Sequence, residues 1–161
     1  PSEDGSSIDI YKISNNYDFI SARMSCINKS REFIFEEEIK GKEYTLTIIN
    51  NECFPPIEIQ TKNDFYDYDA KYISNETILA EAKLSDKELD LMNKISLKAY
   101  KALNCSGWAR VDILGDEDGN LYVLEINTVP GMTSHSCVPK SGGFAGLSYS
   151  DVVTKIISSN V

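Results

Sequence analysis

Two apolar runs near residues 110 and 125 each carry polar side chains that could do chemistry. The first, Gly-Trp-Ala-Arg-Val-Asp-Ile-Leu, holds Arg110 and Asp112, and the second, Leu-Tyr-Val-Leu-Glu-Ile-Asn, holds Glu125 and Asn127. Charged side chains are rarely buried unless they are paired or bound to a metal ion. Two carboxylates and a carboxamide are hard oxygen donors, which suit Mg²⁺. An Arg–Glu pair on a solvated sheet face is the alternative.

The elements that must position these residues are the two strands of a hairpin. The runs are separated by Gly-Asp-Glu-Asp-Gly-Asn, a typical turn sequence. Side chains alternate between faces along a strand. Two sets should therefore each share one face: Trp108, Arg110, Asp112 and Leu114 on the first strand, and Leu121, Val123, Glu125 and Asn127 on the second. If Gly115 pairs with Asn120, Arg110 lies opposite Glu125, and Asp112 lies diagonal to it, within about 8 Å.

A loop rich in hydrogen-bond donors follows the second strand directly. It reads Thr-Val-Pro-Gly-Met-Thr-Ser-His-Ser over residues 128–136. Pro130–Gly131 favours a turn whose backbone N–H groups could face a ligand. Hydroxyl groups follow at Thr133, Ser134 and Ser136. A strand with metal-binding carboxylates that leads into such a loop predicts a site for phosphate and carboxylate groups.

These motifs together resemble the C-terminal signature of D-alanine–D-alanine ligases, which belong to the ATP-grasp superfamily. A further run, Phe-Tyr-Asp-Tyr-Asp-Ala-Lys-Tyr at 65–72, matches the same family closely. The resemblance implies an α+β fold, the ATP-grasp C-terminal lobe, in which a mainly antiparallel sheet is flanked by helices. It also implies that the parent protein joins two D-alanines through a D-alanyl phosphate to give D-alanyl-D-alanine for peptidoglycan and cell-wall synthesis. The expected cofactors are ATP and two Mg²⁺ ions, with Mn²⁺ as an alternative.

The resemblance assigns roles to residues of the hairpin and the loop. Asp112, Glu125 and Asn127 would be the metal ligands, with Glu125 bridging two ions. Arg110, a fixed cation with a planar donor fork, suits a developing oxyanion and the γ-phosphate. The backbone N–H of Gly131 would assist it, and a residue without a side chain lets the backbone approach closely. Ser136 would bind the carboxylate of the second substrate.

The resemblance also implies contacts to the nucleotide and the first substrate. Backbone groups of the acidic run Glu36, Glu37 and Glu38 would pair with the adenine edge, with Ile39 packed nearby and Glu43 on the ribose. Lys71 would contact the phosphates. Tyr72 would join Ser6 and a glutamate of the family's N-terminal domain in one network. The family tends to have Gly at the position of Asp9.

Several other segments have clear local patterns. A helix is expected over Asn16–Ile27, with Asn15 or Asn16 as its cap, and a longer helix over Leu84–Leu103, where Ser85 and Glu88 form a capping box. Strands are expected at 8–13, 32–39, 43–49 and 57–59, and a lid is expected from about residue 61 to 78. A short or irregular helix around 140–146 and a last helix capped by Ser150 complete the chain.

Composition limits the remaining possibilities. The chain has 161 residues and a net charge of −9, which argues against non-specific binding to nucleic acid. It has no apolar run long enough for a membrane span and no leader sequence, so a cytoplasmic location is expected. Four dispersed cysteines suggest free thiols in a reducing compartment. Cys137 adjoins the predicted site, but a small buried side chain is the favoured reading of it.

The start of the chain at Pro1, without Met, suggests a fragment. We expect residues 1–161 to be the C-terminal ATP-grasp domain, without the N-terminal domain and the upstream ATP-binding lysines. Such a fragment should be inactive alone and bind ATP weakly, and its parent could be a homodimer. The alternatives are another ATP-grasp carboxylate–amine ligase and a non-catalytic nucleotide- or metal-binding module. The run Asp-Glu-Asp-Gly-Asn at 116–120 could be a calcium loop, although a plain turn fits better.

Overall fold

The computed structural model describes residues 1–2, 9–27, 29, 31–61 and 77–159. The chain divides into two compact units. The first takes in residues 1–38 and 61–77, and the second takes in residues 39–60 and 78–161. The predictions for Ser6, Lys71 and Tyr72, and for most of the lid, fall outside the described residues. Among the residues described, no helix combines the length and the apolar character needed to cross a membrane.

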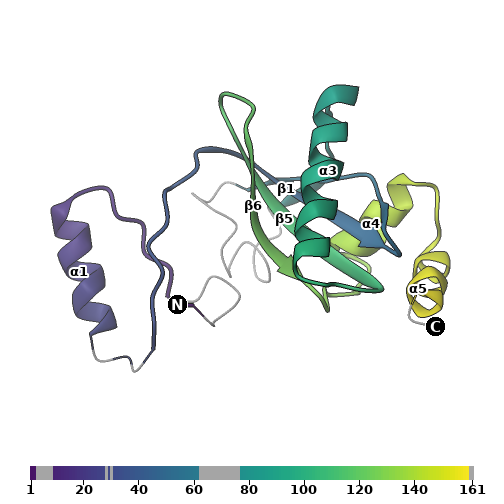
Figure 1. Ribbon diagram of the computed structural model, residues 1–161. Coiled ribbons are helices and arrows are strands. Elements are labelled where there is room, and N and C mark those ends of the chain that lie inside the picture. The colour runs from purple at the N-terminus through teal and green to yellow at the C-terminus, as the bar shows by residue number, and fades with distance from the viewer. Residues whose placement is uncertain (3–8, 28, 30, 62–76, 160–161) are drawn as a thin grey trace. The chain divides into compact units, whose positions relative to one another are not determined.

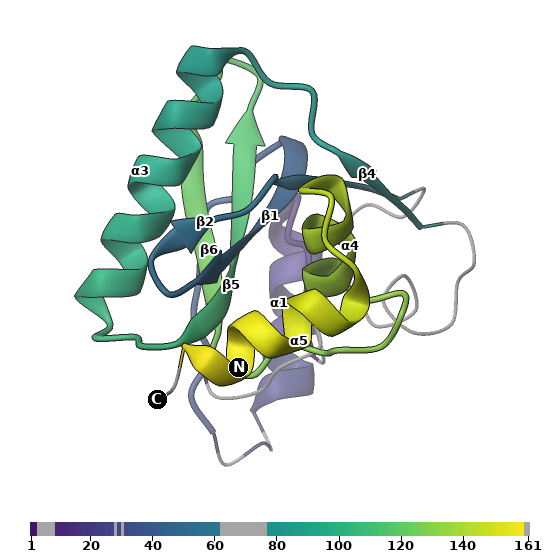
Figure 2. The same cartoon turned by 90° about the vertical axis from the view of Figure 1, so that its right-hand side faces the viewer.

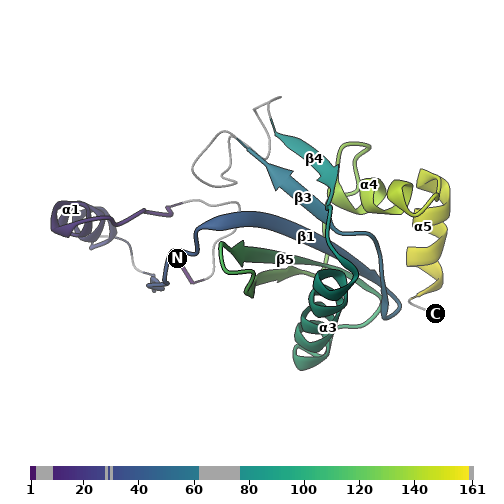
Figure 3. The same ribbon diagram turned by 90° about the horizontal axis from the view of Figure 1, so that it is seen from above.

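The second unit is built on a six-stranded sheet with the order β4-β3-β1-β5-β6, in which β2 also pairs with β1. All of these pairs are antiparallel. The strands are β1 (Gly41–Ile49), β2 (Glu52–Cys53), β3 (Ile57–Gln60), β4 (Ile78–Glu81), β5 (Trp108–Asp116) and β6 (Leu121–Asn127). The long central pair β1 and β5 is flanked by β6 on one side (Figures 1 and 2) and by β2 and β3 on the other (Figures 2 and 3).

Helices cover both faces of this sheet. Alternate residues of β1 and β5 pack with α3 (Asp86–Ala102) in the main core, which consists of Tyr44, Leu46, Ile48, Met92, Tyr100, Ala109, Val111 and Ile113. On the other face, α4 (Cys137–Phe144) and α5 (Tyr149–Ser158) form a smaller core with Ile49, Phe54, Val138 and Val152. Figure 3 shows α3 on one side of the strands and α4 and α5 on the other. The predicted α+β class, a mainly antiparallel sheet flanked by helices, is confirmed.

Local signals in the sequence correctly located α1 and α3. Ser85 caps α3, and its capping box with Glu88 is present. In the first unit, α1 (Asn16–Cys26) begins after Asn15, whose side chain accepts hydrogen bonds from the N–H groups of Tyr17 and Asp18 at 2.8 and 3.0 Å. These caps depend only on neighbours in sequence, which is why they can be read from the sequence.

Three expectations need correction. The described parts of 8–13 and 32–39 form no strand, and no described strand pairs with either run. The lid was expected to reach residue 78, but Ile78 begins β4, which pairs with β3. The short helix expected around 140–146 is confirmed as α4. The cap of α5 is Ser148, which forms a capping box with Asp151, whereas Ser150 lies in the first turn.

Candidate functional site

The hairpin brings four of the predicted site residues onto one face, with a register that differs from the expected one. Arg110 pairs with Asn127, and Asp112 pairs with Glu125. Glu125 was expected opposite Arg110 instead. The register shifts between Asp112 and Ile113, because Ile113 pairs with Val123 and leaves one extra residue in β6. This bulge makes Glu125 and Asn127 share the face of Asp112, whereas Val123 lies on the opposite face, contrary to the prediction of one common face.

Asp112 is the centre of a buried hydrogen-bond network. Asp112 is only 5% exposed. The Oδ1 atom accepts hydrogen bonds from Thr45 Oγ1 at 2.6 Å and from Arg110 Nε at 2.9 Å. The Oδ2 atom accepts from an Arg110 terminal nitrogen at 2.7 Å and from Asn127 Nδ2 at 3.0 Å. Both oxygens of this buried carboxylate therefore have two donors each, which compensates for the loss of water.

Two carboxylate oxygens converge at one point of this face. Asn127 Nδ2 lies 3.0 Å from Asp112 Oδ2 and also 3.1 Å from Glu125 Oε1. The three predicted metal ligands are therefore direct neighbours, and a positively polarised amide group lies between the two carboxylates. No group of three or more His, Cys, Asp or Glu side chains among the described residues could hold a metal ion. Two carboxylates with an amide oxygen nevertheless fit the donor chemistry of Mg²⁺.

Arg110 carries a permanent positive charge in this network. Burial lowers its pKa, but the hydrogen bonds and the charge of Asp112 outweigh burial and raise the pKa overall. Two of the five N–H groups of a guanidinium bond to Asp112. The remaining three bond to no other described residue. The ion pair therefore fixes the orientation of the guanidinium and leaves donors for an anion.

The sequence reasoning missed Thr45 on β1, which bonds Asp112 and pairs with it across the sheet. Thr45 and its neighbour Thr47, which pairs with Arg110, are both almost fully buried. Glu43, the predicted ribose ligand, lies two residues before Thr45 and so shares its face. The available signal was the alternation of these two threonines with apolar residues in an otherwise apolar strand. The signal is weak because Thr also has a high strand propensity.

The loop after β6 brings Gly131 and Ser136 together. A Cβ atom at Gly131 would lie 3.2 Å from Ser136 Oγ, which is tighter than an ordinary contact. Ser136 Oγ accepts a hydrogen bond from the N–H of Thr133 at 3.0 Å instead of capping α4. The loop is therefore closed on itself by the hydroxyl of Ser136, and Gly131 permits this close approach.

Cys137 and His135 are neighbours of the site without a chemical signature of their own. Cys137 is 5% exposed, and burial raises the pKa of its thiol. A buried thiol that stays protonated is not a reactive nucleophile, so the structure supports the packing interpretation. All four cysteines are free. His135 is exposed.

The predicted adenine-binding run lies in the first unit, apart from Ile39 in the second. Glu36, Glu37 and Glu38 are exposed and belong to no helix or strand. Glu38 forms an ion pair with Lys12 at 2.6 Å. The side chains of this run therefore face water.

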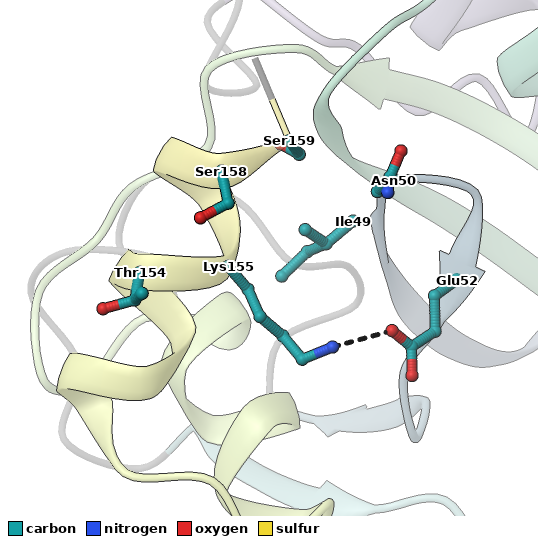
Figure 4. Close-up of a pocket in the computed structure, with 7 residues that line it drawn as sticks. All are labelled: Ile49, Asn50, Glu52, Thr154, Lys155, Ser158 and Ser159. Carbon is teal, nitrogen blue, oxygen red and sulfur yellow. Dashed lines mark hydrogen bonds and ion pairs between the residues drawn. The ribbon is translucent and has the colours of Figure 1, made fainter. Parts of the chain in front are cut away.

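A cavity beside α5 and the turn between β5 and β6 lie outside the predicted site. A shallow cavity of about 250 Å³ lies between α5 and the β1–β2 turn, where Lys155 bonds Glu52 at 2.9 Å (Figure 4). None of its lining residues is a predicted ligand.

In the β5–β6 turn, the Asp116 carboxylate accepts hydrogen bonds from Asn120, Asp118 and Tyr122. These bonds lower the pKa of Asp116, and the hydrogen bond from the Asn120 side chain has the largest effect. The turn is thus closed by its own donors, which favours the plain turn over a calcium loop.

The antiparallel sheet between α3 on one face and α4 and α5 on the other is the architecture of the ATP-grasp C-terminal domain of D-alanine ligases. The family model described as "D-ala D-ala ligase C-terminus" matches residues 1–158. The chain therefore belongs to the D-alanine–D-alanine ligase family and represents its C-terminal part.

Solved structures support this assignment. A D-alanine–D-alanine ligase from Bacillus anthracis is 38% identical with a TM-score of 0.83, over 99% of this chain and 52% of that chain. The structure of a Bacillus anthracis ligase complexed with ATP is 36% identical with a TM-score of 0.76, over 90% and 46%. The VanG D-Ala:D-Ser ligase from Enterococcus faecalis is 30% identical with a TM-score of 0.83, over 98% and 47%. The present chain spans about half the length of these structures.

Proposed function

We propose that the protein carrying this chain is an ATP-dependent ligase that joins two D-alanines into D-alanyl-D-alanine. One D-alanine carboxylate is phosphorylated by ATP, and the amine of the second attacks the acyl phosphate and releases phosphate. The observation that carries this proposal is the convergence of Asp112 Oδ2 and Glu125 Oε1 beside Arg110 on one sheet face. Such a cluster of charge and donors is suited to stabilising a transferring phosphoryl group.

Asp112, Glu125 and Asn127 are the residues that would hold Mg²⁺, with Glu125 shared between two ions. Bound Mg²⁺ supplies charge neutralisation at phosphate oxygens. In the described network Asn127 donates to both carboxylates through its nitrogen. Its carbonyl oxygen is the atom with the chemistry of a metal ligand.

Arg110 would orient the anionic groups of the reaction. Its fork is fixed by Asp112, and its three remaining N–H groups can donate to a γ-phosphate or to the oxyanion that develops during attack. The backbone N–H of Gly131 would donate to the same oxyanion. Ser136, beside Gly131, would bind the carboxylate of the second D-alanine.

The nucleotide contacts complete the proposal. Backbone groups of Glu36, Glu37 and Glu38 would bind the adenine edge, Ile39 would pack near it, and Glu43 would accept from the ribose hydroxyls. Ser6, Lys71 and Tyr72 keep the roles that the resemblance implies. Because the chain spans about half of its solved relatives, we expect it to be inactive alone and to bind ATP weakly. We also expect a cytoplasmic protein, and its parent could be a homodimer.

A substrate panel tests this function. The full-length protein should release phosphate from MgATP when D-alanine is present, and much less with L-alanine or D-lactate. D-serine belongs in the panel because one similar structure is that of a D-Ala:D-Ser ligase. Glu125→Gln should abolish release, whereas Glu117→Gln, on the exposed β5–β6 turn, should not. Phosphate release that does not depend on D-alanine would point to another ATP-grasp ligase. No phosphate release with any substrate would point to a non-catalytic module.

A further inference from the structure

Thr45 contributes a buried hydroxyl to the carboxylate network. Thr45 is 1% exposed, in the middle of β1, and its Oγ1 donates to Asp112 Oδ1 at 2.6 Å. The two residues are 67 positions apart in the sequence and are paired across β1 and β5. A valine would fill the same volume in this strand without a polar group, so the hydroxyl at this position is not needed for packing.

The bond from Thr45 determines which oxygen of Asp112 is left for other partners. Thr45 and Arg110 Nε both bond Oδ1. Oδ2 is thereby directed to the side of Asn127, where it converges with Glu125 Oε1. Arg110 alone does not fix this arrangement, because its fork can bond a carboxylate in more than one rotation. The Thr45 hydroxyl supplies a further fixed point.

We propose that Thr45 is a positioning residue, whose hydroxyl orients Asp112 so that Oδ2 faces the cation site shared with Glu125 and Asn127. The inference rests on the proposed function in one respect, the presence of that cation site. Groups that bond a metal-ligating side chain hold its orientation, and their loss typically lowers metal affinity about 10–100-fold.

Thr47 provides a matched control within the same strand. It is the same residue type, lies on the same face two positions further on, and is also buried. Of these two described threonines, Thr45 is the one that bonds Asp112. Thr45→Val and Thr47→Val therefore make the same chemical change at neighbouring sites, and Thr45→Ser restores the hydroxyl at the first.

Mn²⁺ binding is the first measurement. The probe is MnCl₂ alone, titrated into the full 161-residue chain, with free Mn²⁺ read by electron paramagnetic resonance. We expect Thr45→Val to weaken binding about tenfold, and Thr45→Ser and Thr47→Val to stay within about twofold of the unaltered chain. Unchanged affinity in Thr45→Val would overturn the inference. An equal loss in Thr47→Val would do the same, because the effect would then belong to strand packing.

A crystal structure of Thr45→Val is the second measurement and needs no metal. We expect Asp112 to rotate and Oδ2 to lose its contact with Asn127. An Asp112 carboxylate that keeps this contact would overturn the inference. If the unaltered chain binds no Mn²⁺, the proposed metal site fails, and the crystal structure still decides the role of Thr45. If Thr45→Val does not fold, Thr45→Ala removes the same hydroxyl and is read in the same way.

Discussion

Asp112→Asn is the change that most directly tests the buried network, because it preserves shape and removes one charge. The amide can still accept from Thr45 and Arg110 Nε through its oxygen. Its nitrogen, however, would face the Arg110 and Asn127 donors that now bond Oδ2. Two donors would then meet a third donor, and the Arg110 charge would lose its counter-ion. The change should therefore destabilise the folded chain.

The size of the effect follows from two opposing contributions. Removing one partner of a buried ion pair costs about 3–5 kcal/mol, and the low end applies because the Arg110 side chain is 18% exposed. Loss of repulsion from Glu125 opposes this cost. Glu125 is exposed on the edge strand β6, so that contribution stays below about 1 kcal/mol. The net loss is about 2–3 kcal/mol, which lowers the melting temperature by about 4–12 °C in a chain of this size.

Differential scanning calorimetry without metal measures this shift. Asp90→Asn makes the same substitution on the exposed side of α3, and it should stay within about 0.5 kcal/mol of the unaltered chain. A melting temperature of Asp112→Asn that is unchanged or raised would refute the reasoning. It would mean that repulsion between the two carboxylates outweighs the bonds to Arg110, so that the site is strained in the absence of a cation.

Three further predictions concern the site, the packing and the pH dependence. Arg110→Lys keeps the charge but loses the fork, so kcat of the full-length enzyme should fall about 10²-fold; an unchanged kcat would remove Arg110 from the oxyanion role. In Gly142→Ala the new Cβ would overlap Val152 and cost about 1–3 kcal/mol in urea unfolding, whereas Gly143→Ala, with nothing within 4 Å, should stabilise α4 by about 0.5–1 kcal/mol. Burial raises the pKa of the Cys53 thiol from 9.0 to about 11. The folded chain therefore keeps this proton up to a higher pH than the unfolded chain, so the free energy of unfolding should fall between pH 9 and 11. In Cys53→Ala the free energy of unfolding should fall less steeply over the same range.

Features that depend on near neighbours were predictable from the sequence. The capping box of α3 and the turn between β5 and β6 involve residues at most six positions apart, and both are found as expected. The resemblance supplied the fold class. The runs 8–13 and 32–39 were expected to be strands, but a strand is stable only with a partner. No described residues provide one.

The details of the site could not be predicted because they depend on pairing between distant segments. The bulge at Asp112 and Ile113 moves the side chains of half of β6 to the opposite face of the sheet. An alternating sequence pattern cannot reveal one extra residue. Thr45 becomes recognisable only when β1 is placed beside β5 in the observed register. From the sequence alone, Thr45 is one of several residues in a strand with high β-propensity.

Asn127 shows why the chemistry of a residue type is broader than the role read from its sequence motif. The motif suggests an oxygen ligand, whereas the structure uses the amide nitrogen to bridge Asp112 and Glu125. A carboxylate at this position would place a third negative charge beside one arginine, and burial makes such a cluster costly. An amide has a donor and an acceptor on the same group. It can hold two carboxylates together without a cation and still present oxygen to one, and this combination explains an amide beside two acids on this face.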